Sequence, residues 1–241
     1  MAGTLTPVTF FLILVCGILP AIFWLWFWLK EDKKSPEPRG MILLAFLAGG
    51  FSIPLVFILE TTASDFLVSH GLGGGWWNVT ALAFIEEVVK LAVAFAVTFH
   101  RKMFDEPIDW MIYLIAVALG FSAFENTLFT LKSITLSGAT IGVITASMRF
   151  IGATLLHVLC SSVLGGIIAG AYCKARAYKI EHAIFGILLA TLLHTLFNFF
   201  IMNGSSALPV FAILWLSVIL LLLYFEKVKQ IVCPTNFKTS G

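Results

Sequence analysis

The chain has 241 residues, of which 60% are hydrophobic and 12% are charged, and its mean hydropathy is +1.01. A water-soluble domain of this length could not carry so much apolar surface, so the composition indicates a membrane protein and excludes a soluble globular domain. The formal net charge of +2 is too small for a nucleic-acid-binding surface, and no nucleic-acid partner is expected.

Apolar stretches recur along the whole chain, each near the ~20 residues that cross a ~30 Å hydrocarbon core. Charged, Gly or Pro residues bound them, and in chain order they cover 8–29, 41–59, 78–99, 110–131, 146–172, 183–203 and 208–225. They predict an all-α, polytopic bundle of about seven transmembrane helices, which forms a single integral membrane domain over 1–241. Residues 139–172 are too long for one perpendicular span, so part of 133–145 is expected to be re-entrant or interfacial.

The distribution of basic residues predicts the orientation, because cytoplasmic loops hold Lys and Arg in excess. Twelve of the fifteen lie in the loops after the first, third and fifth stretches and in the tail, whereas Lys132 alone lies on the opposite side. This asymmetry predicts an N-terminus outside, a C-terminus inside and a short cytoplasmic tail at 226–241. No Lys or Arg precedes residue 8, so the first stretch lacks the basic region of a cleavable signal and is expected to remain as a helix.

The chain has four cysteines, which are Cys16, Cys160, Cys173 and Cys233. Their positions show neither CxxC spacing nor the pattern of a disulfide framework, and several lie in apolar stretches. All four are therefore expected to be free, buried thiols.

Nine ionisable or amide side chains remain inside the predicted spans once the loops are set aside. They are Glu86, Glu87, Lys90, Glu125, Asn126, Arg149, His157, His194 and Asn198. A charged group at the centre of a membrane helix costs about 2.5–3.5 kcal/mol on insertion scales, so such residues normally face the bundle interior and have a function. Helical rise places the acids and imidazoles of four spans in one layer, in the outer half of the membrane. This layer predicts a buried site.

Helical spacing pairs several of these residues, since positions three or four apart share a face. Lys90 lies three and four positions after Glu87 and Glu86, and Asn198 lies four after His194. A single lysine can neutralise only one of two adjacent glutamates. The other glutamate is therefore the candidate general base, and Lys90 is expected to support it electrostatically.

A purely structural role is the alternative for some of the set. Single polar residues in membrane helices often only form interhelical hydrogen bonds, which would account for His157 and Asn126. Arg149 lies near the end of its span, where a long side chain can extend to the interface. These residues are accordingly predicted to support the site, whereas Glu86 and Glu87 are predicted to act in it.

Hydrolysis of a peptide bond needs a base, an oxyanion donor and an acid, which Glu, His and Asn side chains can supply. The sequence contains no GxSxG, no convincing Ser/Lys pair and no HExxH, which argues against serine and HExxH proteases. A metal-free site is favoured, with zinc as an alternative if Glu125, His157 and His194 meet in space. A proton-coupled transporter using the same Glu and His residues and a non-catalytic scaffold are the competing functions.

Three motifs occur in a fixed order: Glu86-Glu87-Val-Val-Lys90 reads EExxK, Phe121-Ser-Ala-Phe-Glu125 followed by Asn126 reads FxxxE, and His194-Thr-Leu-Phe-Asn198 reads HxxxN. Over roughly residues 80–200 the chain resembles the PrsW family of intramembrane proteases. It is similar, more distantly, to the CAAX prenyl protease and bacteriocin-processing group, whose patterns are EExxxR, FxxxH and HxxxN or HxxxD. The lysine of the first motif and the glutamate of the second favour PrsW.

The resemblance implies an intramembrane endopeptidase in which Glu86 and Glu87 include the catalytic base. Glu125 and His194 would complete the site, and Asn198 would match the oxyanion-stabilising position of the related group. The catalytic-type core would cover about 78–203. The implied partners are the lipid bilayer of a bacterial-type plasma membrane and a membrane-anchored protein substrate, such as an anti-sigma factor cut at site 1 near its extracytoplasmic end. The sequence does not indicate an oligomeric state.

Overall fold

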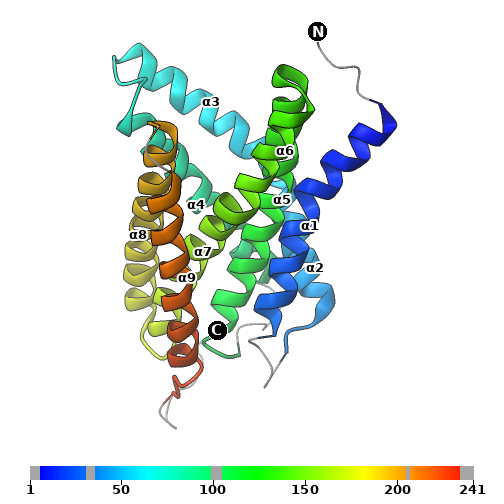
Figure 1. The fold of residues 1–241 in the computed structure, drawn as a ribbon. Helices are drawn as coiled ribbons and strands as arrows, with labels where there is room; N and C mark the ends of the chain where they lie inside the picture. The colour runs from blue at the N-terminus through cyan, green and yellow to red at the C-terminus, as the bar shows by residue number, and fades with distance from the viewer. Residues whose placement is uncertain (1–5, 31–35, 99–104, 205–206, 234–241) are drawn as a thin grey trace.

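The computed structural model describes residues 6–30, 36–98, 105–204 and 207–233. Nearly all of these residues are helical and none of them lies in a strand, which confirms the all-α prediction (Figure 1). The helices are α1 (Pro7–Leu29), α2 (Arg39–Phe51), α3 (Ile53–Ser69), α4 (Trp76–Thr98), α5 (Asp109–Ser137), α6 (Ala139–Met148), the π-helix η1 (Arg149–Ala153), α7 (Thr154–Gly170), α8 (Arg176–Met202) and α9 (Ala207–Val228).

Six helical stretches of the described chain are long and apolar enough to cross a membrane. One of them joins α2 and α3 over Arg39–Ser69, and another joins α6, η1 and α7 over Ala139–Gly170. The remaining helix, α4, is 23 residues long and carries the acids and the lysine of the first motif. Each predicted span therefore has a helical counterpart, and the chain is a multi-pass membrane protein.

Two helices, α5 and α7, form the interior of the bundle. Every residue of α5 from Met111 to Ala123 is buried, and so is every residue of α7 from Thr154 to Ser162. The helices α1, α2 and α7 pack around α5, and α8 and α9 pack on α7. Because a helix that is apolar on all sides is stable when surrounded by others, these two helices can hold polar side chains away from lipid.

Glycines let α2 approach the backbone of α5. A Cβ atom on Gly49 would lie 2.1 Å from the carbonyl oxygen of Val117, and one on Gly120 would lie 1.8 Å from that of Phe46. No side chain can occupy such positions, and small residues at membrane helix contacts permit this close packing. This close contact between α2 and α5 fixes the position of α5 just before the helical turn that carries Glu125.

Residues 133–145 form the tip of a helical hairpin between α5 and α6. The hairpin turns at Gly138, whose φ of 87° is a backbone conformation that glycine adopts without steric cost. Both arms are helical and continuous with the long helices on either side. The expectation that part of this segment is re-entrant or interfacial stays a prediction.

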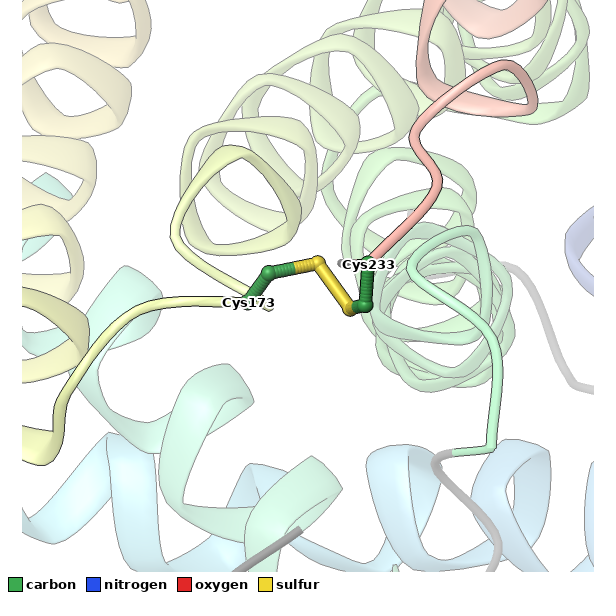
Figure 2. Close-up of a disulfide and its surroundings, with 2 residues drawn as sticks. All are labelled: Cys173 and Cys233. Carbon is green, nitrogen blue, oxygen red and sulfur yellow. A yellow bond between two sulfur atoms is a disulfide. The ribbon is translucent and has the colours of Figure 1, made fainter. Parts of the chain in front are cut away.

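A disulfide joins Cys173, after α7, to Cys233, after α9 (Figure 2). The expectation of four free cysteines is wrong for this pair, and holds for Cys16 and Cys160, of which Cys160 is buried. The two bonded cysteines are separated by 60 residues, and no local motif indicates their pairing. They meet because α7 and α9 pack together and end on the same side of the bundle.

The disulfide provides a test of the predicted orientation. It lies at the end of the bundle where α1 and α9 end and α2 and α8 begin (Figure 1), which is the predicted cytoplasmic end. If this end is cytoplasmic, where thiols are kept reduced, Cys173 and Cys233 should be alkylated in intact cells and should form the bond of the structure on oxidation of isolated membranes. Non-reducing electrophoresis with Cys173→Ser as control measures this. A bond already present in intact cells would contradict the orientation.

Candidate active site

Three of the predicted site residues lie on the buried face of α4, in the middle of the helix. Glu86 is 6% exposed, and Glu87 and Lys90 are fully buried. The Lys90 ammonium donates hydrogen bonds to Glu86 Oε2 at 3.2 Å and to Glu87 Oε1 at 2.9 Å. The pairing expected from spacing along one helix face is therefore present, with one cation shared between two carboxylates.

His157 of α7 extends this network toward α5. The Lys90 ammonium lies 2.8 Å from His157 Nδ1, and because an ammonium is only a donor, Nδ1 accepts. The proton of a neutral imidazole is then on Nε2, which lies 2.9 Å from Glu125 Oε2 and donates to it. His157 thus links the α4 lysine to Glu125 through one buried chain of hydrogen bonds.

His194 of α8 flanks the two glutamates on α4. Its Nδ1 lies 2.8 Å from Glu87 Oε1, and a proton on this nitrogen donates to the carboxylate and fixes the orientation of the ring. Its Nε2 lies 4.0 Å from Glu86 Oε2. The ring also packs edge-on against that of His157, with 5.2 Å between the ring centroids. The two imidazoles therefore enclose the glutamates from α7 and α8.

Glu125 of α5 is held by an arginine in addition to the imidazole of α7. The Arg149 guanidinium donates to Glu125 Oε2 and to Asn126 Oδ1, each at 2.5 Å. Asn126 donates in turn to Thr154 Oγ1 at 2.9 Å and to Ser122 Oγ at 3.1 Å. Arg149 is therefore a cation of the site that Asn126 orients. The two hydroxyls were not predicted, because hydroxyls are common in membrane helices and these have no distinctive spacing.

Arg149 is also the first residue of the π-helix η1, which directly precedes α7. Single π-helical turns within α-helices occur frequently at functional sites. Arg149 and His157 both contact the same atom, Glu125 Oε2. The π-turn lies between them and so contributes to their convergence.

The remaining motif residues occupy different environments. The ring of Phe121 is buried and lies 4.5 Å from the Lys90 ammonium, measured to the ring centroid, which is a cation–π contact. Asn198 lies one turn after His194 and is half-buried, and it forms no hydrogen bond with the residues that the structure describes. The structure thus joins eight of the nine predicted residues in one network and leaves Asn198 outside it.

A further acid, Glu60, lies within α3 and was missed by sequence analysis. The apolar stretch was taken to end at residue 59 because a charge follows, whereas α3 continues to Ser69. Glu60 is half-buried and interacts electrostatically with Glu86, Glu125 and Lys90. Hydropathy alone cannot distinguish a charge that ends a helix from one inside it, so the sequence offered no clear signal.

Four side chains form a donor set that could hold a metal ion: Glu86, Glu87, His157 and His194. Each offers one oxygen or nitrogen, and these atoms lie within 4.8 Å of one another. Glu87 Oε2 is buried and has no hydrogen-bond partner among the described residues, so it is available as a ligand. Carboxylates and imidazoles are ligands of zinc. The set expected from sequence had Glu125 in place of the α4 glutamates, whereas the group of mutually close donor atoms contains Glu86 and Glu87 and not Glu125.

A comparison of the sequence with known protein families identifies the family of the chain. The sequence profile described as "PrsW family intramembrane metalloprotease" matches residues 37–224. The chain belongs to the PrsW family. The match includes α3, α4, α5, α7 and α8, so every helix that contributes to the network lies within it. The resemblance inferred from the three motifs is confirmed, and membership of this family identifies the chain as a membrane protease.

Curated relatives in the PrsW family are similar over most of their length. "Protease PrsW" of Bacillus subtilis (strain 168) is 27% identical over 212 residues, which cover 85% of this chain and 91% of the relative. "Protease PrsW" of Oceanobacillus iheyensis is 27% identical over 209 residues, which cover 85% of this chain and 91% of the relative. That of Geobacillus kaustophilus is 29% identical over 156 residues, covering 64% of each chain. No solved structure matches. These bacterial relatives agree with a bacterial plasma membrane location.

Proposed function

We propose that the chain is an endopeptidase that hydrolyses a peptide bond of a membrane-anchored protein, with Glu86 as the base that activates water. The observation that carries this proposal is the 4.0 Å separation of Glu86 Oε2 from His194 Nε2. One water molecule can form hydrogen bonds with both atoms at this separation. A general base must lie within hydrogen-bond reach of the proton that it removes, and Glu86 meets this requirement.

The two adjacent glutamates have different roles in this proposal. Glu87 is fully buried, pairs with Lys90 and holds the Nδ1 side of His194. Glu86 is the more exposed of the two, and its contact with Lys90 is longer, at 3.2 Å against 2.9 Å. Glu86 therefore faces the water, while Glu87 orients the imidazole. The second requirement of the reaction, a donor for the oxyanion, is assigned to Asn198, because its amide forms no hydrogen bond with the described residues.

Zinc suits three members of the donor set, Glu87, His157 and His194, and Glu86 then remains free to act as the base. Besides the unpaired Glu87 Oε2, the electrostatic balance supports a bound cation. Three carboxylates of this layer are paired with only two permanent cations, a lysine and an arginine, and buried charges require compensation. When bound, zinc would supply a Lewis acid that also favours ionisation of water. The residues of the chain would hold the ion and keep Glu86 and His194 next to the water.

We expect the purified protein to bind one equivalent of zinc, measured by elemental analysis after dialysis. His157→Ala removes one donor and should lower the affinity for zinc by more than about 10-fold, because loss of an outer-shell partner alone has at least that effect. His70→Ala, which changes an exposed histidine, is the control. Full cleavage activity in chelator-washed protein that contains no zinc would contradict this expectation.

The proposed substrate is a membrane-anchored protein cut near its extracytoplasmic side. Glu86 lies ten residues into α4, which corresponds to about 15 Å of helix. With the predicted orientation, the scissile bond would lie close to the middle of the bilayer, slightly toward its outer side. The family resemblance suggests an anti-sigma factor as the substrate. Membrane proteins that are cleaved in cells with the wild-type chain, and remain intact with Glu86→Gln, would identify it.

A direct test uses purified protein reconstituted into vesicles with a membrane-anchored reporter. Loss of cleavage in Glu86→Gln and His194→Ala, with both variants folded, is the result expected for a protease. A substrate-driven proton flux that is lost in the same variants, without any cleavage, would instead support the transporter.

A further inference from the structure

Glu60 lies on the face of α3 that packs against the bundle. On this helix Ile53 and Val56 are buried, Glu60 and Ser64 are half-buried, and most positions between them are exposed. Residues spaced by three and four positions share one side of a helix. The Glu60 side chain therefore starts from the protein-facing side of α3 and not from its lipid-facing side.

The contacts on either side of Glu60 fix its height relative to α4. Below it, Val56 packs in one cluster with Val89 of α4 and Phe121 of α5. Above it, the Ser64 hydroxyl donates to Asn78 Oδ1 at 3.0 Å. Glu60 lies midway between these two contacts, and α4 runs antiparallel to α3, so it is level with the middle of the segment between residues 78 and 89.

The same reasoning relates Glu60 to α5. Glu60 follows Val56 by four residues, and Glu125 follows Phe121 by four, on two helices that both lead from the shared cluster toward the same end of the bundle, α3 at an inclination to α5 (Figure 1). One helical turn covers about 5.4 Å, so both acids lie one turn beyond the shared apolar cluster. Glu60 accordingly interacts electrostatically with Glu125, and with Glu86 and Lys90 of α4. It belongs to the layer of the candidate active site.

Glu60 differs from the other acids of this layer in its partners. Glu86 and Glu87 accept from Lys90, and Glu125 accepts from Arg149. Glu60 has neither an ion pair nor a hydrogen bond with any residue that the structure describes. Its carboxyl group is therefore not held by a cation and is available for proton transfer.

We propose that Glu60 is the general acid that donates a proton to the leaving amine. The inference rests on the proposed protease function. In the reaction, the oxygen of water bonds to the scissile carbonyl carbon and its proton passes to Glu86. The C–N bond then breaks, and the nitrogen takes its proton from Glu60. Proton exchange with water then returns Glu60 to the acid form and Glu86 to the base form. Each cleaved peptide bond therefore consumes one water molecule.

The test compares an amide with an ester at the same scissile position of a membrane-anchored peptide. An amine must be protonated to leave, whereas an alkoxide leaves with less help. Glu60→Gln should therefore lower kcat for the amide by about 10²–10⁴-fold, and for the ester by much less. The decline of amide kcat at high pH, which reports ionisation of the acid, should disappear in Glu60→Gln and persist in Glu60→Asp.

Asp65→Asn, an exposed change on the same helix, is the matched control and should behave as wild type. Equal losses on the amide and the ester, with the high-pH decline retained, would overturn the inference and leave Glu60 a packing or recognition role. Wild-type rates in Glu60→Gln alongside an inactive Glu86→Gln would also overturn it, while the proposed protease function would stand. If Glu86→Gln itself retained activity, the proposed function would fail first.

Discussion

Replacing Glu86 with Gln is expected to lower the rate of peptide cleavage by about 10²–10⁴-fold, the usual contribution of a general base. Gln is close to Glu in size, and its side-chain oxygen can still accept from Lys90, which lies 3.2 Å from Glu86 Oε2. The fold should therefore be retained while the group that removes a proton from water is lost. His194→Ala should cause a loss of similar size, because its Nε2 lies on the other side of the same water position.

The measurement is the initial rate of reporter cleavage in vesicles at equal protein content. Glu181→Gln is the matched control, since it makes the same chemical change at an exposed position of α8. Circular dichroism should show equal helix content in all variants. Wild-type cleavage by Glu86→Gln would contradict the assignment of the base. If Glu87→Gln alone were inactive, the base would be Glu87 instead.

Replacing Lys90 with Met is expected to lower the free energy of unfolding by about 3–5 kcal/mol, the range for breaking a buried ion pair by removing one partner. Lys90 is fully buried and donates to Glu86, Glu87 and His157. Its loss leaves two carboxylates in the bundle interior without their cation. Methionine fills a similar volume, so the predicted loss arises from charge and not from a cavity.

A compensated variant separates these effects. Glu86→Gln and Glu87→Gln, combined with Lys90→Met, remove the two negative charges together with the positive one and should recover most of the lost stability. Unfolding by SDS in mixed micelles, followed by circular dichroism, measures all three proteins. Equal instability of Lys90→Met and the compensated variant would show that lysine contributes through packing or hydrogen bonding to His157 instead of through charge balance.

The fold was largely predictable because the bilayer imposes a length and a composition on each helix. The same physics accounts for the errors. Hydropathy ended the second span at residue 59, since a charge follows, and so left Glu60 outside it. It also treated 133–145 as a separate piece, although two helices simply extend beyond the usual length and meet at Gly138.

The members of the site were largely predictable from the layer that they share, but the individual contacts were predictable only where they lie along one helix. The sharing of Lys90 by two glutamates follows from spacing within α4. Contacts between helices depend on rotation and height, which apolar stretches do not define. The grouping of the two imidazoles with the α4 glutamates was therefore beyond the sequence, and so was the bond between Cys173 and Cys233.

The π-turn η1 also changes the angle between side chains that are a given number of residues apart in this helix. Arg149 and His157 are eight positions apart, and in a regular α-helix eight positions leave two side chains about 80° apart. Because the π-turn contains one inserted residue, eight positions rotate the backbone by about as much as seven positions of a regular α-helix. Two side chains seven positions apart in a regular helix point in directions that differ by only about 20°. Backbone hydrogen bonding, and not residue count, therefore aligns the two groups on Glu125. Deleting one residue within 150–153 would restore a regular helix without separating them, so this pair should tolerate a one-residue deletion that would disrupt other helical sites.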